Sequence, residues 1–331
     1  PVMLGGLSRL AHGLWECGEC GLVDERGFDD DHWVRQAHRV RDERARRPSQ
    51  SKFRVVAVVV YERGDGTVSH VIGHNDEAAC LKNSICAERA AFVQLCMLPQ
   101  SACSRVTAVY IASDAAEPIT PGALCREFMM SSPLTSTDTR IVMEGGGRRL
   151  DLLLAGLYPH ASPYIRLTAE EQAAAGRRLG PAVRPFPAAH EQQAWEGAVA
   201  AAQRDARPLH AIGYGACVVF EDGSDARAWQ WKALEYSCSL DAVCLLAPAL
   251  AARRDGGVEP RVLCLADQHG VCHAPHATAR AILVEHGYGD VRVLVHDSDG
   301  HAHTPTAAEL LPTAPTAFDA FLACGGGAGE A

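Results

Sequence analysis

A cysteine and a glutamate stand together where a helix is predicted to begin. Residues 75–97 read as a loop that leads into a helix opening at Cys86, and Glu88 follows two residues later. A helix N-terminus carries partial positive charge and free N–H groups, so a cysteine there is shifted towards the thiolate, the form that binds metals. A carboxylate on an apolar helix is costly unless it has a partner or a role. The pair therefore predicts a zinc thiolate with a carboxylate beside it.

The elements around this helix have simple patterns. Residues 55–61 are β-branched and continuous, which predicts a buried strand; residues 64–66 read as a hairpin turn, and residues 67–73 as the returning strand. The helix from Cys86 is apolar on nearly every side, which predicts burial all round. A further buried strand is expected at residues 106–112. The pair of strands and the helix would then hold Cys86 against a sheet.

A second helix start follows that strand. Pro121 is typical of the first turn of a helix, and this helix would include Cys125. Residues 139–143 read as another strand and residues 150–159 as a helix. The predicted fold class is α/β, with Cys86 and Cys125 each close to the beginning of a helix.

Three segments carry a resemblance to a known family. SKFRVVAVV, NDEAACLKNSICAER and PGALCRE, in this order, resemble the cytidine deaminases, and within them the nucleoside type, whose helix opens CAE. The resemblance covers roughly residues 50–165. It implies a mixed sheet sandwiched by helices, with zinc held between two helix N-termini.

The resemblance also implies roles for individual residues. Cys86 and Cys125 would bind zinc, Glu88 would shuttle protons, Asn75 and Glu77 would hydrogen-bond the ribose hydroxyls, Phe53 would pack against the pyrimidine ring, and the backbone around Ala87 would bind the pyrimidine carbonyl. The implied reaction converts cytidine or deoxycytidine to uridine or deoxyuridine and ammonia, as in pyrimidine salvage. Zinc suits it because the metal lowers the pKa of water towards about 7, and a carboxylate that is not a ligand can then transfer the protons.

The chain departs from the family pattern at Gly122. The second family element is PCxxC, whereas here Pro121 is followed by Gly122, so two protein ligands are secured where a catalytic zinc normally has three. One explanation is a replacement ligand from elsewhere in the unit, for which the candidates are Cys80, Cys96, Cys103, His70 and His74. Another is a site with two thiolates and an extra water. The third is loss of the metal, which would leave a catalytically inactive nucleoside-binding or regulatory protein.

The second half of the chain reads as a degenerate copy of the first. GYGACVVFEDGSD parallels the first strand and turn, EYSCSLDAVCLLAPAL parallels the Cys86 helix, and APHATARAILVEHG parallels the Cys125 helix. In this pairing Leu240 replaces Glu88, Ala279 replaces Cys125, and Cys238 and His276 stand at ligand positions. The chemistry of the first copy is not repeated.

The resemblance and the repeat together imply tandem cytidine deaminase-like three-layer α-β-α sandwiches with mixed sheets. The predicted boundaries are an N-terminal helical extension at 1–48, a catalytic repeat at 49–165, a helical linker at 166–208, a degenerate repeat at 209–316 and a flexible tail at 317–331. A homodimer is implied by the resemblance alone.

Composition narrows the class of protein. A formal net charge of −9 over 331 residues argues against the basic face that nucleic-acid binding requires. It also disfavours a polynucleotide-editing deaminase, as does the Asn75 and Glu77 pair, which suits a free sugar. Apolar runs fall short of the roughly 18 residues of a membrane span. Thirteen cysteines, an odd number set inside apolar runs, predict reduced thiols and a cytoplasmic location.

Three further features of the sequence are interpreted as having no bound ligand. Cys17 and Cys20 form a lone CxxC and read as loop cysteines. The cluster of Cys272, His273 and His276 reads as polar loop residues. Residues 31–47 are rich in arginine and acid, which predicts a solvated helix.

Overall fold

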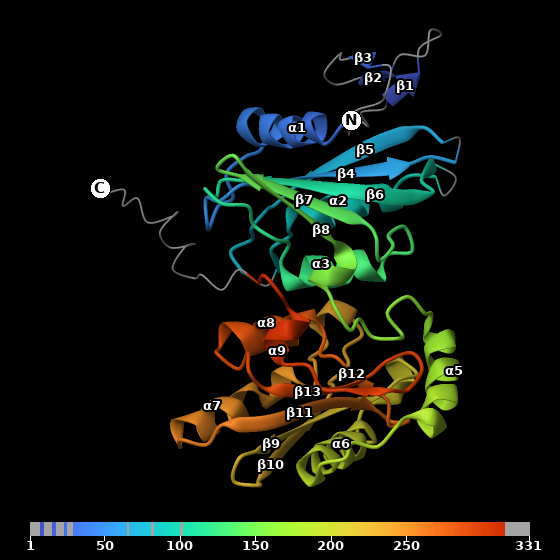
Figure 1. The fold of residues 1–331 in the computed structure, drawn as a ribbon, viewed down its shortest axis with the longest axis vertical. Helices are drawn as coiled ribbons and strands as arrows, with labels where there is room; N and C mark the ends of the chain where they lie inside the picture. The colour runs from blue at the N-terminus through green and yellow to red at the C-terminus, as the bar shows by residue number, and fades with distance from the viewer. Residues whose placement is uncertain are drawn as a thin grey trace. The chain divides into compact units, whose positions relative to one another are not determined.

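The computed structural model describes residues 29–314 except 65, 81–82 and 100–101, together with the short strands β1 (Leu7–Arg9), β2 (Trp15–Cys17) and β3 (Val23–Asp24). The chain divides into two compact units, one ending at Leu157 and the other spanning Tyr158–Ala314 (Figure 1). The interpretations of the Cys17 and Cys20 side chains and of the tail at 317–331 fall outside the described residues.

The first unit is built on a five-stranded mixed sheet. Its strands are β4 (Val55–Glu62), β5 (Val68–His74), β6 (Arg105–Ser113), β7 (Arg140–Gly145) and β8 (Arg148–Leu153), in the spatial order β5-β4-β6-β7-β8. Only β6 and β7 run parallel. A parallel pair requires a crossover connection, and α3 (Ala123–Ser131) lies within the chain that joins these two strands.

Helices cover both faces of this sheet (Figure 1). Helix α1 (Asp30–Glu43) packs on one face, while α2 (Ala87–Cys96) and α3 (Ala123–Ser131) lie on the other, and α4 (Leu154–Leu157) follows β8. The predicted three-layer arrangement with a mixed sheet is therefore confirmed.

Helix α1 is not the fully solvated helix that its charged residues suggested. It buries Trp33, Val34, Ala37 and Val40. The first three of these residues share a core cluster with β4 and β6. These four recur at helical spacing, so one apolar stripe faces the sheet while the arginines and acids occupy the rest of the surface.

Two expectations for the first unit are wrong in part. Residues 148–153 form strand β8 rather than the start of a helix, because the glycine pair 146–147 has positive φ values of 57° and 76° and turns the chain into a hairpin with β7. Helix α2 is not buried all round, since Val93 is 49% exposed and Met97, just after the helix, is 82% exposed.

The second unit repeats the sheet of the first. Its strands are β9 (Tyr214–Phe220), β10 (Asp225–Trp229), β11 (Pro260–Asp267), β13 (Arg292–His296) and β14 (Ala302–His303), in the order β10-β9-β11-β13-β14. Along this path only β11 and β13 are parallel. The order of strands and the position of the parallel pair match those of the first unit.

One strand has no equivalent on that path. Strand β12 (Cys272–His273) pairs with β11 and is fully buried. The interpretation of Cys272 and His273 as polar loop residues is therefore wrong, because their backbone belongs to the sheet and their side chains to the interior.

The helices of the second unit are α5 (Ala169–Leu179), α6 (Ala189–Ala202), α7 (Ala247–Asp255), α8 (Ala277–Glu285) and α9 (Ala307–Leu310). Alternate residues of β9 face two different cores: Cys217 and Val219 pack with α6, whereas Val218 and Phe220 pack with α5, α7, α8 and α9. Helices α5 and α6, within the predicted linker at 166–208, thus contribute directly to the packing of this unit. None of the helices in the described part of the chain is long and apolar enough to cross a membrane.

Candidate active site

Cys86, Glu88 and Cys125 come together at the starts of two helices. Cys86 is the N-cap of α2, Glu88 lies in the first turn of that helix, and Cys125 lies in the first turn of α3. One potential ligand atom from each residue falls within a group whose members are no more than 4.8 Å apart. The Cys125 sulfur lies 3.4 Å from a carboxylate oxygen of Glu88.

The surroundings of these groups alter their ionisation. The pKa of Cys86 is lowered to about 7, chiefly because Cys125 donates a hydrogen bond to it, and the Arg89 guanidinium 3.7 Å away contributes. The same hydrogen bond raises the pKa of Cys125. Burial raises the pKa of Glu88 because it disfavours the charged carboxylate. Cys86 is therefore the thiolate of the pair, and Glu88 is a carboxylate suited to gaining and losing a proton.

A glycine sets the approach of α2 to the sheet. A Cβ atom on Gly73 of β5 would lie 2.2 Å from the Ala87 carbonyl oxygen and 2.4 Å from the Ala91 amide nitrogen. Such distances are sterically excluded, so only glycine lets the first turn of α2 rest on β5. This contact fixes the height of Cys86 above the sheet.

Arg126 fixes the start of α3 and was missed in the sequence. Its side chain is fully buried and donates hydrogen bonds to the Pro121 carbonyl (2.7 Å), the Thr120 hydroxyl (2.8 Å) and the Leu157 carbonyl (2.9 Å). These bonds hold the turn around Gly122, from which α3 and Cys125 begin. An arginine directly after the expected ligand, repeated 154 residues later as Arg280, is the signal that could have identified it.

A pocket of about 200 Å³ lies over the cluster. Its lining includes all the predicted site residues except the fully buried Cys125: Phe53, Asn75, Glu77, Cys86, Ala87 and Glu88. Ser51, Ser84 and Thr120 also line it and were not anticipated. The structure thus brings the polar residues and the aromatic ring to one cavity.

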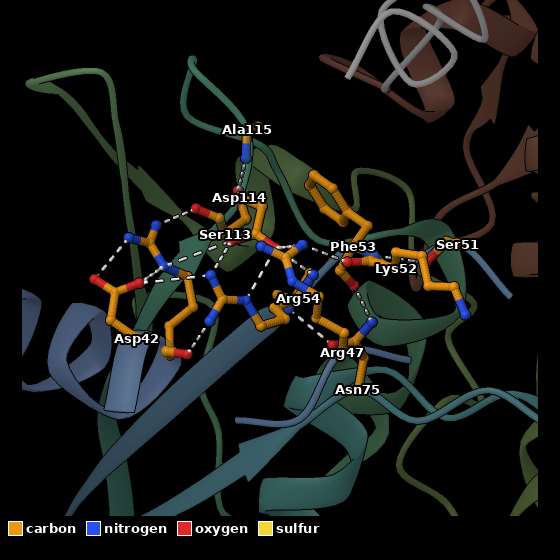
Figure 2. A network of polar contacts seen from close by, with 12 residues as sticks. Asp42, Arg47, Ser51, Lys52, Phe53, Arg54, Asn75, Ser113, Asp114 and Ala115 are labelled. Carbon is orange, nitrogen blue, oxygen red and sulfur yellow. Dashed lines mark hydrogen bonds and ion pairs between the residues drawn. The ribbon is translucent and has the colours of Figure 1, made fainter. Parts of the chain in front are cut away.

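Asn75 and Glu77 already make hydrogen bonds to the neighbouring chain. The Asn75 amide accepts a hydrogen bond from the Val55 N–H (2.7 Å). It donates one to the Phe53 carbonyl (2.8 Å), as Figure 2 shows. The Glu77 carboxylate accepts from the N–H (2.6 Å) and the hydroxyl (2.5 Å) of Ser51. Asn75 therefore ties the segment that carries Phe53 to the loop that follows β5.

A charged network supports the same segment (Figure 2). The Arg54 guanidinium forms a two-point contact with Asp114, with distances of 2.9 and 3.1 Å, and donates to the Arg41 carbonyl (2.8 Å). The contact with Asp114 raises the pKa of Arg54. Because Arg54 follows Phe53 directly, this network limits the positions that the phenyl ring can take.

The donor set fits zinc but is short of one protein ligand. Two thiolates near helix N-termini are typical zinc ligands. Among the residues that the structure describes, none of the five proposed replacement ligands, Cys80, Cys96, Cys103, His70 and His74, belongs to the cluster with Cys86 and Cys125. Gly122, the N-cap of α3, has φ −62° and ψ 159°, and a Cβ atom there would meet no other atom within 4 Å.

The second unit has the same framework without this chemistry. Arg280 is fully buried and donates to the Pro275 carbonyl (2.7 Å) and the Leu310 carbonyl (2.7 Å), as Arg126 does to Pro121 and Leu157. This match places Ala279 at the position of Cys125, as the sequence predicted.

The predicted pairing of Leu240 with Glu88 is wrong by three residues. An isolated bridge joins Trp231 to Leu240, just as one joins Asp76 to Ile85 ahead of Cys86. Asp241 is therefore the counterpart of Cys86, and Val243 that of Glu88. Cys238 lies in an exposed 3₁₀ turn outside the equivalent site.

A pocket of about 270 Å³ occupies the corresponding place in the second unit. Gln230, Lys232 and Ser239 line it where Asn75, Glu77 and Ser84 line the first pocket. It is larger than the first pocket, but it lacks the thiol and carboxylate groups, so the chemistry lies in the first unit.

The comparison with protein families also falls on the first unit. Residues 29–140 match the family model described as the cytidine and deoxycytidylate deaminase zinc-binding region. A search of curated proteins finds no significant match.

Solved structures with local similarity are bacterial cytidine deaminases. The Mycobacterium tuberculosis enzyme is 25% identical, with a TM-score of 0.32, and the match covers 37% of this chain and 94% of that one. The Burkholderia pseudomallei enzyme is 25% identical, with a TM-score of 0.33 and coverage of 40% and 98%. The Bacillus anthracis enzyme is 15% identical, with a TM-score of 0.31 and coverage of 41% and 97%.

Proposed function

Because residues 29–140 belong to the cytidine deaminase family, we propose that this chain hydrolyses the 4-amino group of a pyrimidine nucleoside, cytidine or deoxycytidine. The observation that carries the proposal is the group formed by half-buried Cys86 with buried Glu88 and Cys125 at a pocket. The products are uridine or deoxyuridine and ammonia.

Residues around the pocket orient the substrate. Glu77 offers carboxylate oxygens and Asn75 an amide to the sugar hydroxyls, while the Phe53 ring packs against the pyrimidine. The backbone at Ala87, in the first turn of α2, binds the pyrimidine carbonyl because helix N-termini present free N–H groups. A free nucleoside is the expected substrate, since a net charge of −9 disfavours polynucleotide binding.

Glu88 carries the protons. Cys86 and Cys125 would hold zinc, which supplies a nucleophile at neutral pH by lowering the pKa of water. The Glu88 carboxylate accepts a proton, delivers one to the ring nitrogen and assists the departure of ammonia. Burial of Glu88 supports this role because it raises the pKa of the carboxyl, which helps the group to hold a proton.

The decisive experiment measures zinc and turnover on one sample. Purified protein is analysed for its metal content, and the absorbance of added cytidine or deoxycytidine is followed. We expect close to one zinc per chain and loss of the cytidine band. Glu88→Gln should keep the zinc and lose turnover by about 10²–10⁴-fold. Glu191→Gln changes a buried carboxylate at the start of α6 in the second unit and should leave turnover intact.

The glycine at position 122 favours an alternative function, that of a catalytically inactive protein that binds a nucleoside. With two thiolates in the described cluster, zinc affinity could fall below what catalysis needs. This alternative predicts no zinc and no turnover, even with zinc added back, while calorimetry still detects cytidine binding that Phe53→Ala weakens. Turnover that depends on Glu88 would rule it out.

A further inference from the structure

The pocket of about 270 Å³ in the second unit, which we call the second pocket, has no part in the proposed reaction. Its wall is built from segments that are distant in sequence: Tyr214 opens β9, Gln230 follows β10, and His276 is the N-cap of α8. Gln172 of α5 and His210 add to the polar part of the wall. Elements from most of the unit therefore converge on one cavity.

The second pocket lacks the groups that are proposed to react in the first. Among the described residues that line it there is neither a thiol nor a carboxylate, whereas Glu77, Cys86 and Glu88 line the first pocket. Lys232 and Val243 stand where Glu77 and Glu88 stand in the first unit. A ligand held in the second pocket is therefore bound and not converted.

The positive charge of Lys232 is neutralised inside the protein. Its ammonium nitrogen lies 3.1 Å from a carboxylate oxygen of Asp205, and the two side chains are 6% and 0% exposed. It also donates hydrogen bonds to the carbonyls of Ile212 (2.6 Å) and His210 (3.3 Å). An ammonium group has three N–H donors, and these contacts use all three. Lys232 therefore shapes the pocket without offering a charge to an anionic ligand.

His210 and Gln172 present neutral hydrogen-bonding groups. His210 Nδ1 accepts from the Ile212 N–H (3.2 Å), so the proton of the neutral ring lies on Nε2, which is a donor. Burial lowers the pKa of His210, which keeps this ring neutral at pH 7. The Gln172 amide nitrogen donates to the carbonyls of Tyr164 (3.3 Å) and Leu167 (2.9 Å). Its amide oxygen has no hydrogen-bond donor in the described part of the chain and is an open acceptor.

Gln230 offers both a donor and an acceptor. Its backbone N–H donates to the Tyr214 carbonyl (3.0 Å), which fixes the backbone at this point, while its side-chain amide makes no hydrogen bond to the residues that the structure describes. The corresponding residue of the first unit is Asn75, whose amide is used to tie the segment of Phe53 to the loop after β5. The second pocket therefore has an open amide where the first uses its amide internally.

Two aromatic rings form part of the wall. Tyr214 and His276 meet edge to face, with ring centroids 5.4 Å apart and 88° between the ring planes. The buried ring of His273 lies 5.4 Å from that of Tyr214 and supports it. Packed aromatic rings favour a planar ring in the ligand. The volume of about 270 Å³ exceeds the 200 Å³ of the first pocket, for which a nucleoside is proposed.

We propose that the second pocket binds an uncharged nucleoside and holds it without reaction. The edge of a nucleobase carries both donors and acceptors, which match the Gln230 amide, the His210 Nε2–H and the Gln172 carbonyl, and its flat ring suits the aromatic part of the wall. A charged ligand gains nothing from Lys232, because that ammonium is already paired. The site goes beyond the proposed deamination and does not depend on it.

The test measures binding rather than turnover, in the full chain with Phe53→Ala and Glu77→Ala, so that the first pocket no longer contributes. Uridine and adenosine, neither of which is a substrate of the proposed reaction, are titrated in turn by calorimetry at pH 7.5. We expect at least one of them to bind with one molecule per chain. The 5′-monophosphate of that nucleoside should bind about tenfold more weakly, because the phosphate loses water without meeting a free cation. This result stands even if the first unit proves inactive.

Variants locate the bound nucleoside. Gln230→Leu keeps the side-chain volume and removes an amide that makes no internal hydrogen bond, so the melting temperature without ligand should not change. The affinity should fall about tenfold, and adding His210→Phe should abolish binding. His190→Ala with Gln192→Ala alters α6 outside the pocket and should have no effect. The proposal is overturned if neither nucleoside binds, if binding survives Gln230→Leu with His210→Phe, or if the monophosphate binds as tightly as the nucleoside.

Discussion

Gly122 is the residue at which the candidate zinc site differs from the cytidine deaminase pattern that it resembles. Its backbone has φ −62° and ψ 159°, which any L-residue can adopt, and the space beside its α-carbon is open. As the N-cap of α3, it sits where the positive end of the helix favours a thiolate. A cysteine at this position would therefore meet no steric barrier.

We predict that Gly122→Cys raises the zinc affinity by at least about 10–100-fold, because a direct ligand should count for no less than the outer-shell contacts that give this range. Competition with a chromophoric chelator measures the change. Gly122→Ser is the matched control, since it adds nearly the same volume without a thiol. Equal zinc affinity of the two variants would show that position 122 does not face the metal.

Residues with distinctive chemistry could be predicted from the sequence, and residues that act through packing could not. Cys86 and Glu88 were predicted together because a thiol at a helix start and a carboxylate on an apolar helix suit a metal site, the family resemblance added Cys125, and the structure brings the three together. Arg126 was missed because its role depends on the carbonyl of Leu157, which is remote in sequence. The third-ligand candidates could not be ranked, because sequence does not give distances.

At the scale of elements, Arg126 joins the start of α3 to the end of α4. Replacing it by lysine removes the planar group that reaches several buried acceptors at once. We predict that Arg126→Lys lowers the free energy of unfolding by ~2–4 kcal/mol and also weakens zinc binding.

Arg280→Lys is the control for this prediction. Arg280 has the same surroundings at the start of α8, so a similar loss of stability is expected, but zinc binding should not change. Denaturant unfolding and zinc titration are compared for the two variants. Equal zinc affinities would show that Arg126 contributes to the fold alone.

Asp30 ties helix α1 to the sheet in a pH-dependent way. Its carboxylate accepts hydrogen bonds from Arg140 (2.7 and 3.1 Å) and from the Tyr110 hydroxyl (2.5 Å). The bond from Arg140 is the main cause of a pKa below the ordinary value of 3.8. The stabilisation is therefore complete above about pH 4 and is lost as the pH falls through the lowered pKa.

We predict that Asp30→Asn lowers the free energy of unfolding by about 0.5–1 kcal/mol at pH 7, a value discounted because the side chain is one-third exposed. The difference from the wild type should shrink as the pH falls below 4. Asp31→Asn, which removes a more exposed acid from the same helix turn, should cost less. A difference that grows in acid would contradict the assigned ion pair.

Strands with a regular side-chain pattern were predicted well, whereas the hairpin before β8 and the alignment of the second unit were not. Strands β4, β5, β6 and β7 lie close to the segments 55–61, 67–73, 106–112 and 139–143 that were predicted as strands. Strand β8 was missed because LDLLLA can serve as a strand or a helix, and the hairpin glycines before it decide between them. In the second unit, Leu240 was misplaced because the sequence comparison matched Cys238 with Cys86, whereas the isolated bridges show that Leu240 corresponds to Ile85.

At the scale of the whole molecule, two units share one order of strands, but the candidate chemistry lies in one of them. The first unit keeps the thiols and Glu88, while the second places Asp241, Val243 and Ala279 at the corresponding positions. The second unit nevertheless exposes several large apolar side chains on residues 231–240: Trp231, Leu234, Tyr236 and Leu240. A group of this kind is typical of a protein–protein contact.

We predict that the chain forms a homodimer that covers these residues, as the resemblance to nucleoside deaminases implies. Leu234 and Tyr236 are 85% and 75% exposed, and burying them in a contact would be favourable by about 1.5–3 kcal/mol for a side chain of this size. Sedimentation velocity should give about twice the chain mass of 35.4 kDa for the wild type. Leu234→Glu with Tyr236→Glu should give a folded monomer, because two carboxylates would be buried without partners. Ala251→Glu, on the exposed side of α7, should remain a dimer. A monomeric wild type, or a dimer that tolerates both glutamates, would contradict the prediction.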